Sequence, residues 1–156
     1  MTHTFRLPDA AATDVLAVRL VAAMPPDKQG WIILLQGDLG AGKSTLARAM
    51  LHEMGHSGAV PSPTYTLVEP YDLQDLTVYH IDLYRIAGME ELEYLGWSDL
   101  RDGLILLEWP ERVPQLSGQA DLHLMLEYEG NGRLATLAAL SPRGANVLHR
   151  LDTATY

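Results

Sequence analysis

The nine residues GDLGAGKST, from Gly37 to Thr45, have the types and spacing of a loop that binds nucleotide phosphates. Two glycines five positions apart precede Lys43 and the hydroxyl residue Ser44, which is the pattern G-x-x-x-x-G-K-[ST]. In such a loop the backbone N–H groups surround phosphate oxygens, the lysine contacts the β- and γ-phosphates and the hydroxyl binds Mg²⁺. The residues predicted to contact a nucleotide here are Gly37, Asp38, Leu39, Gly40, Ala41, Gly42, Lys43, Ser44 and Thr45.

Two carboxylates are predicted to lie beside this loop. Asp82 closes the apolar run VYHID and Glu108 closes LILLE, so each stands at the end of an expected strand. Ligands of open α/β sheets bind at the carboxyl ends of the strands, and Mg²⁺ prefers oxygen ligands. One carboxylate is therefore predicted to hold the metal while the other orients the attacking water or nucleophile. The spacing leaves open which residue has which role.

Thr64 lies in the loop PSPTYT, which follows the helix expected after the phosphate loop. Nucleotide switches often place a hydroxyl there that senses the γ-phosphate and magnesium. An ordinary loop threonine is the alternative interpretation.

The stretch HEMGH, from His52 to His56, matches the zinc-protease pattern H-E-x-x-H. That chemistry requires both histidines on one face of a helix. Gly55 and the following Ser57-Gly58 end the expected helix before His56, so we do not expect zinc binding here.

Hydrophobic periodicity predicts the elements that position these residues. Helices are expected over 10–24, 44–54 and 88–100; strands are expected over 31–36, 64–71, 76–84, 103–110, 121–130 and 133–140. The strands over 64–71 and 76–84 are expected to form a hairpin. The whole chain, 1–156, is predicted to be one α/β domain of the three-layer P-loop NTPase type. Its central mixed sheet would have parallel core strands and an antiparallel C-terminal hairpin.

Composition excludes several classes of function. The net charge is −9 and only Lys28 and Lys43 are lysines, which disfavours direct binding to DNA or RNA. The chain has no cysteine, no apolar run long enough to cross a membrane and no signal sequence, so a soluble, cytoplasmic protein is expected. The acidic surface provides solubility or a docking face for a basic partner protein.

With these residues placed, the chain resembles the TsaE (YjeE-like) family of bacterial ATPases, which are required for threonylcarbamoyl modification of tRNA adenosine. The resemblance runs nearly end to end and is carried by GDLGAGKST, SPTYTLVEPY (62–71), HIDLYR (80–85), EELEYLG (90–96), LLEWPERV (106–113) and Gly132-Arg133.

The resemblance implies a role for each matching residue. Lys43 and Ser44 would hold phosphate and magnesium, with Lys43 and Asp82 required for catalysis and Glu108 a metal ligand. It further implies that Thr64 belongs to a switch-like loop, that Trp109 lies near the site and that Arg133 reaches the nucleotide. Ala10 departs from the acidic nucleotide contact of some family members, which leaves adenine recognition there open.

The function that the resemblance implies is hydrolysis of ATP with Mg²⁺ in support of a larger complex. A TsaD-type transferase and its TsaB-type subunit would modify tRNA, which this chain would meet only through them. The alternatives are a P-loop small-molecule kinase and a nucleotide-gated binding module without turnover. A kinase of this size usually has an arginine-rich lid, and the arginines here are scattered. No N-K-x-D stretch for guanine recognition occurs.

Overall fold

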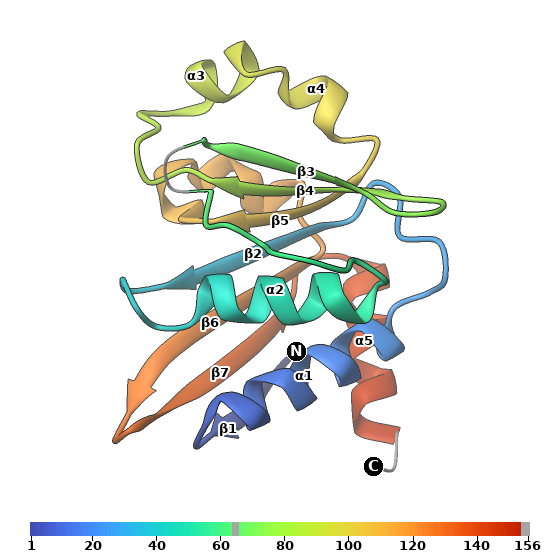
Figure 1. Cartoon of the computed structure of the whole chain (residues 1–156), viewed down its shortest axis with the longest axis vertical. Coiled ribbons are helices and arrows are strands. Elements are labelled where there is room, and N and C mark those ends of the chain that lie inside the picture. Colours follow the sequence, from blue (N-terminus) through green and yellow to red (C-terminus); the bar gives the residue numbers. More distant parts are fainter. Residues whose placement is uncertain (64–65, 154–156) are drawn as a thin grey trace.

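A computed structural model describes residues 1–63 and 66–153 of the chain, which form a mixed sheet flanked by helices (Figure 1). The strands are β1 (Thr2–Leu7), β2 (Ile32–Gly37), β3 (Val68–Asp72), β4 (Thr77–Asp82), β5 (Leu104–Glu108), β6 (Leu122–Glu129) and β7 (Gly132–Ala139). The helices are α1 (Ala10–Ala23), α2 (Lys43–Glu53), α3 (Met89–Tyr94), α4 (Trp97–Leu100) and α5 (Pro142–Thr153), with 3-10 turns η1 (Pro110–Arg112) and η2 (Pro114–Gly118).

The strands lie in the order β1-β7-β6-β2-β5-β4-β3. The central strands β6, β2, β5 and β4 are parallel, whereas β7, β1 and β3 pair antiparallel at the two sides. In the register of the parallel strands, Glu108 lies opposite Leu35 on one side and Asp82 on the other. The ends of β4 and β5 therefore meet at the edge of the sheet where β2 runs into the phosphate loop.

Alternate side chains of β2 fill two different core layers, because successive residues of a strand point to opposite faces. Ile33 and Leu35 pack with buried residues of α1, α2 and α5. Ile32 and Leu34 pack with residues of the α3–α4 segment and the 3-10 turns. This burial on both faces explains why the strand sequence is continuously apolar, and it confirms the predicted three-layer α/β architecture.

Several boundaries differ from the prediction. The sequence analysis did not predict β1, whose residues alternate between exposed and partly buried, or the C-terminal helix α5. The single helix expected over 88–100 is two short helices, because Gly96 adopts φ +89° between them. Residues 64–65 of the strand expected over 64–71 lie outside the described residues; β3 covers Val68–Asp72, and its hairpin with β4 is confirmed.

No helix in residues 1–63 and 66–153 combines the length and apolar character that a membrane span requires.

Asp121, just before β6, joins the sheet to the C-terminal helix. The residue is 4% exposed, and its carboxylate accepts hydrogen bonds from the Ile32 amide at 3.0 Å, Ser141 Oγ at 2.7 Å and Arg143 Nε at 2.8 Å. Burial alone would raise the pKa of Asp121. The donors Arg143, Ser141 and Ile32 outweigh that effect and lower the pKa below its usual 3.8.

We predict that Asp121→Asn lowers the free energy of unfolding at pH 7 by about 1–3 kcal/mol, because a charge-assisted set of hydrogen bonds is lost. A depressed native pKa stabilises the protein above the unfolded-state pKa, and this contribution disappears as pH falls through the native pKa. Urea denaturation should therefore show the full difference between wild type and variant at pH 7 and a shrinking one below pH about 4. The exposed Asp14→Asn is the matched control, and a pH-independent difference would contradict this assignment.

Candidate nucleotide-binding site

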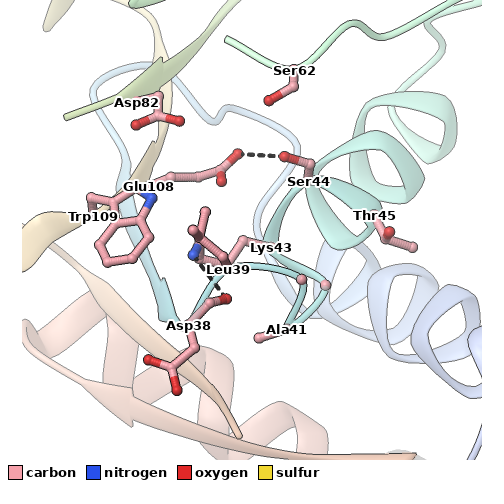
Figure 2. Close-up of a pocket in the computed structure, with 12 residues that line it drawn as sticks. Asp38, Leu39, Ala41, Lys43, Ser44, Thr45, Ser62, Asp82, Glu108 and Trp109 are labelled. Atoms are coloured by element: carbon pink, nitrogen blue, oxygen red, sulfur yellow. Dashed lines mark hydrogen bonds between the residues drawn. The ribbon is translucent and has the colours of Figure 1, made fainter. Parts of the chain in front are cut away.

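A cavity of about 240 Å³ lies where β2 passes into α2 (Figure 2). Residues 38–45 of the phosphate loop line one side of it, and Ser62, Asp82, Glu108 and Trp109 line the rest. The structure thus brings together residues that are far apart in the sequence and that the sequence analysis had grouped as one site.

Two glycines let the loop fold tightly against the sheet. A Cβ on Gly37 would lie 2.7 Å from the carbonyl oxygen of Leu126 on β6, so a larger residue cannot follow the same path. Gly42 adopts φ +109° directly before α2, a conformation that L-residues with a side chain rarely accept. The N-terminus of α2, which favours anions, is consequently aimed at the cavity.

The Lys43 ammonium group lies on the loop itself. The residue is 5% exposed, and Nζ donates hydrogen bonds to the carbonyl oxygen of Gly37 and, at 3.3 Å, to that of Asp38. Nζ also lies 4.0 Å from the ring centroid of Trp109. Burial lowers the pKa of Lys43, and the nearby carboxylates, Glu108 foremost, partly oppose that effect. An added phosphate would favour the charged ammonium group and offset its desolvation.

Glu108 has two close partners at the end of β5. Its Oε2 accepts a hydrogen bond from Ser44 Oγ at 2.9 Å and lies 2.5 Å from Nε2 of His80 (Figure 2 shows the first contact). Glu108 is 3% exposed and His80 is fully buried. This row of side chains connects α2, β5 and β4 at the wall of the cavity.

The sequence analysis assigned no role to His80, although the spacing of His80 and Asp82 gave part of the information needed. His80 stands two residues before Asp82 on β4, so both side chains must point to the same face of the sheet. Asp82 lies opposite Glu108 in the parallel register, so the residue at position 80 lies two residues before that pair, on the same face of the sheet and near the Glu108 side chain. The missing information was the strand order, which a single sequence does not contain.

Asp82 ends β4 beside Glu108, and the residue is 2% exposed. Its Oδ1 accepts a hydrogen bond from the Tyr84 amide at 2.8 Å, which fixes the carboxylate at the start of the following turn. The Asp82 amide donates to the carbonyl oxygen of Leu67 at 2.9 Å. Hydrogen bonds thus hold both the carboxylate and the backbone amide of Asp82, which lines the cavity.

The separation of the Ser44 and Glu108 oxygen atoms, which form a hydrogen bond with each other, is compatible with a shared magnesium ion. Adjacent ligands of an octahedral Mg²⁺ with bonds of 2.0–2.1 Å lie about 2.9 Å apart. The Ser44 Oγ to Glu108 Oε2 distance is 2.9 Å. Mg²⁺ is commonly held by one or two protein oxygens together with phosphates and water, so this pair fits the ion. Within residues 1–63 and 66–153 no cluster of three or more His, Cys, Asp or Glu side chains could hold a metal.

The histidines of the HEMGH stretch are directed elsewhere. His52 and His56 contact the carbonyl oxygens of Gly58 and Ala59 at 3.1 and 3.2 Å. α2 ends at Glu53, so the two histidines do not share a helix, as the sequence analysis expected.

Arg133 binds the outside of the phosphate loop instead of lining the phosphate cavity. Its Nε and Nη2 each donate to a loop carbonyl oxygen at 3.1 Å, those of Ala41 and Gly40 respectively. Tyr128 lies under the guanidinium group and donates to the carbonyl oxygen of Leu39 at 2.8 Å. The β6–β7 hairpin therefore supports the loop from behind.

A second cavity, of about 200 Å³, adjoins the first on the side of α1 and the β6–β7 hairpin. Both cavities are bordered by residues 40–42 and Thr45. Ala10 and Arg133 line the second one. Thr64, the remaining predicted contact, lies outside the described residues, whereas the nearby Ser62 lines the phosphate cavity.

A phosphate loop between a central parallel strand and a helix, with a serine and a strand-end carboxylate beside it, defines a P-loop nucleotide-binding protein. Comparison with known proteins narrows this class. The profile of the family described as "Threonylcarbamoyl adenosine biosynthesis protein TsaE" matches residues 7–135. The chain belongs to the TsaE family of tRNA threonylcarbamoyladenosine biosynthesis proteins.

Individual relatives agree with this assignment. The TsaE proteins of Haemophilus influenzae and a Synechocystis species are each 44% identical to this chain; the first alignment covers 75% of both chains and the second 74% of both. The crystal structure of YdiB from Bacillus subtilis matches with a TM-score of 0.76 and 25% identity, over 97% of this chain and 95% of that one.

We predict that His80→Ala lowers the free energy of unfolding by about 2–4 kcal/mol, because it opens a cavity and leaves a buried carboxylate short of a donor. His80→Gln, which carries a donor at a similar reach, should recover part of this loss. His123→Ala is the matched control, since His123 is only partly buried and its ring contacts the neutral Gln36 at 2.8 Å. Urea denaturation of the three variants tests the assignment, and equal losses for His80→Ala and His80→Gln would contradict it.

Proposed function

We propose that this protein is a magnesium-dependent ATPase that supports threonylcarbamoyl modification of tRNA adenosine. It would bind a TsaD-type transferase with its TsaB-type subunit and reset that complex through ATP hydrolysis. The observation that carries the proposal is the contact between Ser44 and Glu108 beside Lys43, in a cavity that the phosphate loop lines. Membership of the TsaE family connects the proposed hydrolysis to the threonylcarbamoyl modification of tRNA.

Each side chain in the cavity has a proposed task. Lys43 would exchange its contacts with the loop carbonyls for the β- and γ-phosphates. Ser44 and Glu108 would hold Mg²⁺, which when bound neutralises charge on the phosphate oxygens. Asp82 would orient the attacking water, since it lies beside Glu108 and is fixed by the Tyr84 amide. His80 would keep Glu108 in place.

The rest of the nucleotide is proposed to occupy the second cavity. A nucleotide with its phosphates on Lys43 would leave the loop past Thr45, which borders both cavities. Its ribose and base would then lie near Ala10 and Arg133. Arg133 would act on the nucleotide partly through the loop that it supports.

The charges in the cavity support the proposed dependence on partners. Among its described lining residues, Lys43 is the one cation, and three carboxylates (Asp38, Asp82 and Glu108) surround it. Phosphoryl transfer often requires an additional cation, such as an arginine supplied by another protein. We therefore expect slow hydrolysis by the isolated protein.

The deciding experiment measures Mg²⁺-dependent ATP turnover with and without the TsaD-type and TsaB-type proteins. Partners should raise turnover of the wild type, and Lys43→Ala and Asp82→Ala should each reduce the stimulated rate by about 10²-fold or more. ATP binding is measured in parallel by calorimetry. Asp82→Ala should retain ATP binding because it removes no proposed phosphate ligand.

The controls separate three functions. Asp99→Ala, an exposed carboxylate on α4, should leave turnover unchanged. ATP binding without turnover in any partner state would replace the proposal with a nucleotide-gated binding module. Transfer of the phosphate to an added small molecule instead of water would identify a kinase.

A further inference from the structure

A cavity of about 840 Å³, larger than the two at the phosphate loop, opens on the surface beside α3. Its apolar lining includes Leu67, Ile86, Met89 and Leu95, and its polar lining includes Glu90 and Glu91. We call this hollow the α3 groove. Figure 1 shows α3 and α4 at the end of the molecule away from α1 and α5.

We infer that the α3 groove docks a segment of the partner protein that presents apolar side chains flanked by lysine or arginine. This inference rests on the proposed function, since it names the surface through which a partner would control the ATPase. Two features of the groove carry it: its exposed apolar and acidic composition, and its backbone connection to the nucleotide site.

The groove exposes large side chains that a folded protein ordinarily covers. Tyr94 is 94% exposed and Leu95 is 39% exposed, at the end of α3. Ile86 and Met89 line the same hollow. Clustered exposed apolar residues mark binding surfaces, and tyrosine is among the residues that most often anchor protein interfaces.

The charge at the groove selects the kind of partner. The exposed Glu90, Glu91 and Glu93 follow one another along α3, and the described lining contains neither lysine nor arginine. These carboxylates would repel the phosphates of tRNA and of an anionic membrane. They complement a cationic protein segment, and the net charge of −9 would steer such a partner toward the chain.

Backbone hydrogen bonds connect the groove to the main chain of Asp82 and Glu108, the two carboxylate residues of the nucleotide site. The Leu67 carbonyl oxygen accepts from the Asp82 amide at 2.9 Å. On the other side, the Ile86 amide donates to Leu83 at 2.9 Å, and the Leu83 amide donates to the Glu108 carbonyl oxygen at 3.0 Å. A segment seated on Leu67 and Ile86 would therefore press on the two chain segments that position Asp82 and Glu108.

Leu67 is itself held in a conformation that leucine disfavours. Its φ is +68°, and its amide is fixed by the carbonyl oxygen of Pro63 at 2.8 Å. Strained residues of this kind concentrate at switch regions and ligand clamps. Binding at the groove and binding at the phosphate loop should accordingly influence each other, and that influence must be reciprocal.

The test compares two double variants. The groove variant combines Glu90→Lys and Tyr94→Ala, and the control variant combines Asp14→Lys and Val15→Ala. Both pairs join an exposed acid to an exposed apolar residue, and the control pair lies on α1. Affinity for the TsaD-type and TsaB-type pair is measured by calorimetry with ATP and Mg²⁺, together with basal turnover. The groove variant should lose at least about tenfold in affinity, as expected for an interface anchor, with basal turnover unchanged. The control should behave as wild type.

The coupling is measured as the change in ATP affinity when the partners are added. Wild type and control should show the same change, and the groove variant should show a smaller one at partner concentrations that just saturate the wild type.

Distinct outcomes overturn the two proposals. If the wild type neither binds the partners nor responds to them, the proposed function fails, and the groove assignment fails with it. If the wild type binds and the groove variant binds equally well, only the groove assignment is overturned. Binding of tRNA or of phosphatidylserine vesicles that the groove variant alone loses would also overturn it, because the occupant would then not be a protein.

Discussion

The carboxylate of Glu108 lies in the interior, where a charge is stable only if hydrogen-bond donors compensate for the loss of water. Those donors come from two other elements, Ser44 on α2 and His80 on β4. Satisfying one buried charge therefore fixes the phosphate-loop helix relative to the two strands that end at the site. The same oxygen that accepts from Ser44 is a proposed metal ligand.

Two features of the sheet make this arrangement possible. The parallel register places Asp82 opposite Glu108, and the apolar residues before each carboxylate anchor that register in both core layers. On the other side of the loop, Arg133 and Tyr128 bind its outer carbonyl oxygens. The loop is thus held between the central strands and the β6–β7 hairpin, which limits how far its backbone N–H groups can move.

The sequence was sufficient where function depends on local patterns. The phosphate loop, its flanking strand and helix, and the strand-end carboxylates each leave a short signature. His80 and the position of Arg133 depend instead on strand order and on the return of the β6–β7 hairpin, which are tertiary facts. β1 was missed because an edge strand with an exposed side lacks a strong apolar signal, and the division of the 88–100 helix depended on the left-handed conformation of Gly96.

The same construction explains how a partner could act on chemistry that it does not perform. Side chains within the site hold the carboxylate of Glu108, and the Tyr84 amide holds that of Asp82. The backbones of these two residues are nevertheless hydrogen-bonded to Leu67 and Leu83, which lead to the surface beside α3. Asp82 has little room to adjust by itself, because its carboxylate is also bound to the Tyr84 amide. Small displacements at the α3 groove would therefore reach the carboxylates as changes in backbone position, and the buried contacts around Glu108 would resist any change that breaks them. A partner would consequently favour one of a few discrete arrangements of the site, not a continuous range of them.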